Sequence, residues 1–198
     1  ALVRPPGHHA LSDRAMGFCF VNNVAVAAEM LLRRGLAERI AIYDFDVHHG
    51  NGTQAIFYDR KDVLYLSTHQ HPFYPGTGMA KETGEGPGEG TTVNVPLPSG
   101  TTDATLDEVT RSLLIPKVRA FAPDVILLSA GFDGYVGDPL GGFELTPSGF
   151  HAVVGRFRDL AESVADGRIV GVLEGGYALD GLGACVRAAL YAFEGRTL

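Results

Sequence analysis

The chain has 198 residues, of which 45% are hydrophobic and 20% are charged, a composition that suits one globular domain with a buried core and excludes a disordered segment. Its formal net charge is −7 and its densest basic spot is Arg33-Arg34, which argues against direct binding to the phosphate backbone of a nucleic acid. The apolar stretches are too short to span a bilayer, so no membrane association is expected. Two cysteines are too few for a disulfide framework, so we expect an intracellular protein, cytoplasmic or, in a eukaryote, nuclear.

Apolar runs alternate with helix-like segments along the chain. In chain order we expect a helix over Asn22–Arg34, strands over Arg39–Phe45, Val63–Ser67 and Thr92–Val95, a helix over Leu106–Phe121, a strand over Val125–Ser129, a helix over Thr146–Ala165, a strand over Ile169–Leu173 and a helix over Leu179–Phe193. Pro116 should kink or split its helix. The strands are nearly continuous in Val, Ile and Leu, which is typical of strands buried on both faces. This pattern predicts a three-layer α/β/α domain with a mostly parallel sheet, whose site lies at the carboxyl ends of the strands.

Two polar clusters directly follow predicted strands. Asp44, Asp46 and His48 are two residues apart, so an extended chain would point all three to one side. Two carboxylates and an imidazole that converge without a Lys or Arg would repel unless a cation lay among them. Asp133 follows another strand and is expected to converge with Asp46 and His48. One histidine and two aspartates leave an open position for water, as a catalytic zinc site requires, although iron(II), cobalt or manganese would also fit.

Two further clusters offer groups that amide hydrolysis needs. His8 and His9 follow a rigid Pro-Pro-Gly turn and suit a general base and a partner that tunes it. Tyr177 follows Glu174-Gly175-Gly176 after the last strand, and its hydroxyl can donate to a developing oxyanion. Taken singly, a histidine pair is more often incidental and a tyrosine more often a core or rim aromatic.

Together these segments resemble the histone deacetylase/acetylpolyamine amidohydrolase family. The matching stretches, in order along essentially the whole chain, are PPGHHA (Pro5–Ala10), GFCFVNN (Gly17–Asn23), DFDVHHGNGTQ (Asp44–Gln54), PGTG (Pro75–Gly78), SAGFD to GDPLGG (Ser129–Gly142) and LEGGY (Leu173–Tyr177). Their spelling resembles the class II and bacterial branch. The resemblance implies an arginase/deacetylase-like fold and a single catalytic domain over residues 1–198 that lacks the N-terminal segment of other family members.

The resemblance also implies roles for particular residues. It implies zinc held by Asp46, His48 and Asp133, His9 as general base and later acid, His8 bonded to Asp44, Asn51 orienting His9, and Tyr177 polarising the acetyl carbonyl. It implies a substrate tunnel lined by Gly17, Phe18, Tyr74 and Leu140. It further implies a structural potassium ion held by Asp44, Asp46, His48, Ser67 and Thr68, partly through backbone carbonyls.

The implied activity is zinc-dependent hydrolysis of acetyl-lysine or a related acyl amine, with release of acetate. Leu140 stands where a polyamine-selective relative carries glutamate, which favours an acetylated lysine peptide or protein over an acetylpolyamine. An acetylpolyamine deacetylase and a non-catalytic binding module that retains the metal site are the alternatives. An arginase-like two-manganese ureohydrolase would need further acidic ligands, which Asn51 and Gly131-Phe132 do not supply.

Overall fold

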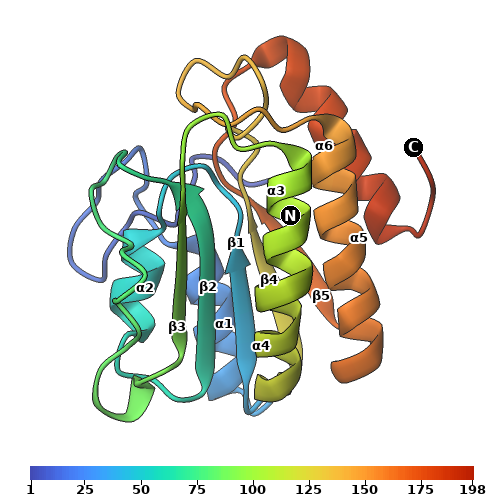
Figure 1. Ribbon diagram of the computed structural model, residues 1–198. Helices are drawn as coiled ribbons and strands as arrows, with labels where there is room; N and C mark the ends of the chain where they lie inside the picture. The colour runs from blue at the N-terminus through green and yellow to red at the C-terminus, as the bar shows by residue number, and fades with distance from the viewer.

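The computed structural model describes residues 1–198, and its centre is a parallel sheet of five strands (Figure 1). The strands are β1 (Ile40–Asp44), β2 (Val63–Gln70), β3 (Thr92–Leu97), β4 (Val125–Ala130) and β5 (Ile169–Leu173), in the order β3-β2-β1-β4-β5. Every neighbouring pair is parallel, which confirms the predicted sheet. Because all strands run in one direction, the loops that follow them meet at one edge of the sheet.

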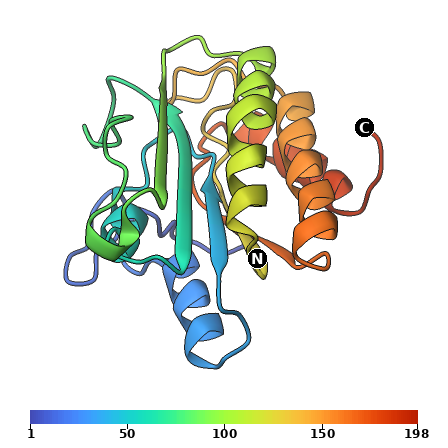
Figure 2. The same cartoon turned by 60° about the horizontal axis from the view of Figure 1, so that its bottom comes forward.

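Helices cover both faces of this sheet, so the domain has the predicted three layers. They are α1 (Asn23–Arg33), α2 (Asn51–Phe57), α3 (Asp103–Val109), α4 (Ile115–Phe121), α5 (Pro147–Val164) and α6 (Leu179–Phe193), with a 3₁₀ turn over Gly86–Gly88 and a π-helical stretch over Thr110–Leu114. The two views place α1 and α2 on one face and α3 to α6 on the other (Figure 2). None of these helices combines the length and apolarity needed to cross a membrane.

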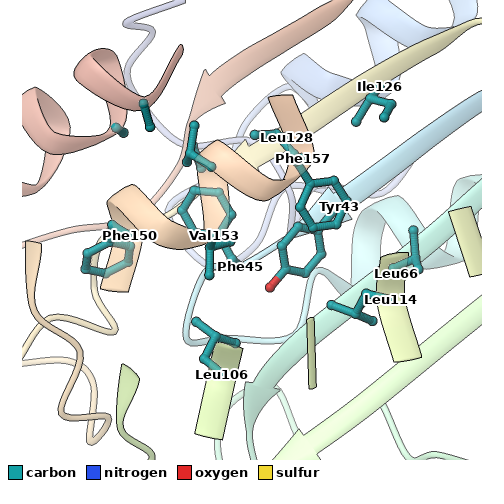
Figure 3. Close-up of a cluster of buried hydrophobic side chains, with 14 of the residues drawn as sticks. Tyr43, Phe45, Leu66, Leu106, Leu114, Ile126, Leu128, Phe150, Val153 and Phe157 are labelled. Atoms are coloured by element: carbon teal, nitrogen blue, oxygen red, sulfur yellow. The ribbon is translucent and has the colours of Figure 1, made fainter. Parts of the chain in front are cut away.

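Alternate residues along the strands supply two separate cores. Ile40 and Ile42 of β1 belong to the smaller core under α1, whereas Ala41 and Tyr43 belong to the larger core under α5. Figure 3 shows the larger core, in which the rings of Tyr43 and Phe157 stack with centroids 4.5 Å apart. Burial on both faces explains why the strands read as continuous apolar runs.

The helix predicted over Leu106–Phe121 begins earlier, at Asp103, and is divided into α3, the π-helical stretch and α4. Pro116 lies in the first turn of α4, directly after the π-helical stretch. Proline has no N–H for the preceding turn, so the hydrogen-bond ladder changes there. The predicted split at Pro116 was confirmed.

Helix α2 was not predicted, and it supports the tandem-histidine segment. It begins at Asn51, and the backbone N–H groups of Gly52 and Thr53 both donate to the carbonyl of His8, at 3.0 and 3.1 Å. A Cβ at Gly52 would lie 2.2 Å from the carbonyl oxygen of Ala10, so only glycine allows this close approach. The start of α2 is therefore anchored against residues 8–10.

Candidate active site

Asp46, His48 and Asp133 meet at the carboxyl edge of the sheet. Their ligand atoms all lie within 4.8 Å of one another, and His48 Nδ1 is 3.1 Å from both Asp46 Oδ1 and Asp133 Oδ2. The predicted reason for their convergence was wrong, because β1 ends at Asp44 and the chain bends over residues 46–48. Asp46 and His48 reach the cluster through this bend, while the carboxylate of Asp44 contacts His8 instead.

The electrostatics of the cluster fit a small divalent cation. Burial and the neighbouring Asp46 raise the pKa of Asp133 to about 7. Burial opposes a charge on His48, but hydrogen bonds to Asp133 and Asp46 outweigh it and raise the His48 pKa to about 10. A proton on His48 thus relieves the repulsion between the two carboxylates, and a cation bound by all three groups would do so more fully. The set of one nitrogen and two oxygen donors suits zinc, iron(II) or cobalt.

Glycines allow the backbone to enclose this cluster closely. A Cβ at Gly131 would lie 2.2 Å from Asp46 Oδ2, and a Cβ at Gly175 would lie 2.1 Å from Asp133 Oδ2. The Gly175 N–H donates to Asp46 Oδ2 at 2.8 Å, and the Val47 N–H donates to Asp133 Oδ1 at 2.8 Å. The His48 N–H also donates to Asp46 Oδ1 at 2.9 Å, so backbone groups orient both oxygens of Asp46 and one oxygen of Asp133.

The two histidines of the tandem differ in protonation, because His9 is neutral and His8 is positively charged. Asn51 Oδ1 accepts from His9 Nδ1 at 2.8 Å, which places the proton on Nδ1 and leaves Nε2 as an acceptor. Burial and the neighbouring His8 lower the pKa of His9 to about 3, so His9 is neutral. Burial also disfavours a charge on His8, but Asp44, 2.9 Å from its Nδ1, and Asp46 raise its pKa well above the ordinary value. A neutral imidazole therefore lies beside a charged one, with ring centroids 4.1 Å apart.

One pocket of about 630 Å³ brings the predicted groups together. It is lined by Pro6, His8, His9, Gly17, Phe18, His48, Phe73, Tyr74, Pro139, Leu140 and Tyr177. Gly17 has φ +56°, and a Cβ there would lie 2.2 Å from His9 Cδ2, so the chain passes directly over the imidazole. The Tyr74 ring packs edge-on against His9 with centroids 5.1 Å apart. Phe73, which the sequence reasoning missed although it adjoins Tyr74, stacks on His48 at 5.3 Å.

Tyr177 reaches this pocket from the loop after β5. Its N–H donates to Asp138 Oδ2 at 2.7 Å, and the N–H of Leu140 donates to Asp138 Oδ1 at 2.9 Å. Burial, with Asp46 and Asp133 nearby, raises the pKa of the Tyr177 phenol, so its hydroxyl is a neutral donor. The buried carboxylate of Asp138 thus links two pocket walls, a role that the sequence alone did not reveal.

Comparisons with known proteins agree with this geometry. The family model described as Histone deacetylase domain matches residues 1–193. The chain belongs to the histone deacetylase family. The crystal structure of the HDA15 HD domain superimposes with a TM-score of 0.91 at 44% sequence identity, over 98% of this chain and 56% of that one. The predicted deacetylase-like α/β fold was therefore confirmed.

Similar curated proteins come from plants, archaea and bacteria. Histone deacetylase 10, chloroplastic, of Oryza sativa subsp. japonica is 46% identical over 98% of this chain and 44% of its own length. A probable deacetylase of Archaeoglobus fulgidus is 49% identical over 91% of this chain and 50% of its own. A histone deacetylase-like amidohydrolase of Pseudomonas aeruginosa is 48% identical over 90% and 47%, respectively. This histone deacetylase domain spans half or less of the length of these curated relatives.

The residues of the predicted potassium site lie within β2 (Ser67, Thr68) and at or just after the end of β1 (Asp44, Asp46, His48). Asp44 is paired in register with Ser67. The Ser67 hydroxyl bonds His69 Nδ1 at 2.9 Å, and the Thr68 hydroxyl bonds the hydroxyl of Tyr43 at 2.9 Å. The potassium site stays a prediction.

Proposed function

We propose that this histone deacetylase family domain hydrolyses the amide bond of acetylated lysine side chains and releases acetate and the free amine. The observation that supports it most is that His48 of the metal-ligand cluster, the neutral His9 and the Tyr177 hydroxyl all belong to one pocket. Zinc is the proposed ion, held by Asp46, His48 and Asp133. Bound zinc would lower the pKa of a water molecule to about 7 and polarise a carbonyl.

His9 is the proposed general base and acid. Its Nδ1 proton is committed to Asn51, so Nε2 takes the proton of the attacking water. The low His9 pKa, caused by burial and by His8, makes that proton easy to pass on. It goes to the nitrogen of the departing amine as the C–N bond breaks. His8, bonded to Asp44, keeps a positive charge beside the site.

Tyr177 is the proposed oxyanion donor, and the pocket walls position the substrate. As the carbonyl carbon becomes tetrahedral, the Tyr177 hydroxyl donates to the oxygen that gains negative charge, an interaction worth about 3 kcal/mol for a single donor. Phe18 packs edge-on against Tyr177, with ring centroids 6.1 Å apart, and together with Tyr74 it offers apolar walls for the lysine methylenes.

The substrate proposed is an acetylated lysine peptide or protein, and acetylpolyamines are the alternative. Leu140 lines the pocket and is 39% exposed. Because its side chain is uncharged, it cannot hold the second ammonium group of a polyamine. The predicted potassium ion belongs to the same proposal as a structural group near Asp44.

The test is a comparison of two substrates on the zinc-loaded chain. We expect a higher kcat/KM for an acetyl-lysine reporter peptide than for N-acetylspermidine, and we expect Leu140→Glu to shift the ratio toward the polyamine. A folded, zinc-loaded chain that hydrolyses no acyl amine would refute the proposal. Binding of the peptide without turnover would favour the non-catalytic binding module instead.

A further inference from the structure

We propose that Arg4 and Glu174 are positioning residues that together join two segments, the histidine segment (residues 4–10), which carries His9, and the tyrosine loop (residues 174–178), which carries Tyr177. We call this pair of contacts the latch. The inference rests on the proposed function, because it concerns the relative position of the base and the oxyanion donor. The latch joins two segments near opposite ends of the chain, since Arg4 and Gly176 are separated by 172 positions in the sequence.

Glu174 holds the backbone just before the proposed base. Its carboxylate is fully buried, and Oε2 accepts from the N–H groups of Gly7 and His8 at 2.6 and 3.0 Å. Oε1 accepts from the Ser129 hydroxyl at 3.1 Å. Since the residues are buried, removal of the carboxylate would leave two N–H donors without a partner, which is costly. Glu174 therefore fixes the turn from which His9 projects.

Arg4 holds the loop just before the proposed oxyanion donor. Its guanidinium donates to the carbonyl of Gly176 at 2.9 Å and lies 5.7 Å from the centroid of the Tyr177 ring. Gly176 has φ +127°, a conformation that side chains rarely adopt. Arg4 therefore makes both a hydrogen bond to this unusual turn and a cation–π contact with the Tyr177 ring that follows it.

The exchange is reciprocal, and the neighbouring backbone extends it. The histidine segment contributes Arg4 to the tyrosine loop, and the tyrosine loop contributes Glu174 to the histidine segment. The Leu173 N–H donates to the carbonyl of Ala1 at 3.0 Å. A displacement of either segment is thus transmitted to the other. Because His9 and Tyr177 would act on the same amide, a misplacement of about 1 Å would cost up to about 10²-fold in rate.

The first test separates positioning from folding. We expect Glu174→Ala and Arg4→Ala to lower kcat on the reporter peptide by about 10- to 100-fold, with KM and zinc content unchanged. Glu174→Gln should restore kcat to within about threefold, because its amide oxygen can accept both N–H groups and its NH₂ can donate to Ser129. Arg187→Ala, which alters an exposed arginine on α6, is the matched control and should leave kcat unchanged.

The second test needs no turnover and reads each half of the latch from the opposite segment. Amide hydrogen exchange followed by mass spectrometry should accelerate in residues 4–10 of Glu174→Ala and in residues 174–178 of Arg4→Ala. Arg4 is exposed, so its variant should fold even if Glu174→Ala does not. Unchanged exchange across the segments, or an unchanged kcat in Arg4→Ala, overturns the latch. If the two variants show the accelerated exchange but the wild-type chain hydrolyses no substrate, the proposed function is refuted and the latch is still supported.

Discussion

Replacement of Tyr177 by phenylalanine removes the proposed oxyanion donor and little else. The ring keeps its edge-on contact with Phe18, and the loop keeps its backbone bond to Asp138. The Tyr177 hydroxyl makes no hydrogen bond within the chain, so its loss should leave folding stability almost unchanged. The loss of one donor to a developing oxyanion costs about 3–4 kcal/mol, which corresponds to about a 10²- to 10³-fold fall in kcat. KM should stay the same, because the donor acts mainly in the transition state.

The assay is steady-state hydrolysis of an acetyl-lysine reporter by the zinc-loaded chain, with zinc content and melting temperature measured in parallel. Tyr74→Phe is the control, because it removes a hydroxyl from the same pocket while the ring can still pack against His9. We expect this control to keep kcat within about threefold, since the hydroxyl has no assigned chemical step. A Tyr177→Phe variant that also keeps kcat within that range would refute the assigned role.

Three further variants or conditions test other parts of the account. Asp133→Asn should lower the zinc content of the purified chain, measured by plasma mass spectrometry, because a charged ligand is lost; full zinc occupancy would contradict the ligand set. The metal-free chain should melt at lower temperature as pH rises from about 7 to 10. The folded His48 pKa of about 10 lies above its unfolded value, so the bound proton stabilises the fold only below that pH. The zinc-loaded chain should lack this trend, and a melting temperature of the metal-free chain that rises with pH would contradict the prediction. Phe157→Ala should lower the free energy of unfolding by about 3–5 kcal/mol in urea titrations, because it empties a buried site stacked on Tyr43, whereas the exposed Leu190→Ala should change it by less than about 1 kcal/mol.

Local patterns were sufficient to predict most of the fold. Strand β5 and helix α6 have the bounds that were predicted, because each is a regular apolar pattern, β5 between Arg168 and Glu174 and α6 ending before Glu194-Gly195. Helix α2 escaped prediction because it is short and begins inside a polar segment with glycine at positions 50 and 52. What stabilises its start is the pair of hydrogen bonds from the Gly52 and Thr53 N–H groups to the carbonyl of His8, which no local pattern reveals.

The candidate site divides in the same way. Asp46, His48 and Asp133 were found because converging carboxylates imply a cation, and the structure does bring them together. Arg4 and Glu174 were missed because their partners lie more than 160 residues away in the chain. A single sequence gives no sign of such contacts, since spacing reports only on neighbours along a strand or helix.

X-ray diffraction at the zinc absorption edge, from crystals of the zinc-loaded chain, tests the central claim most directly. The account predicts one anomalous peak, coordinated by Asp46, His48 and Asp133 and facing the pocket that holds His9 and Tyr177. A peak elsewhere, or no peak from a folded chain soaked in zinc, would contradict it.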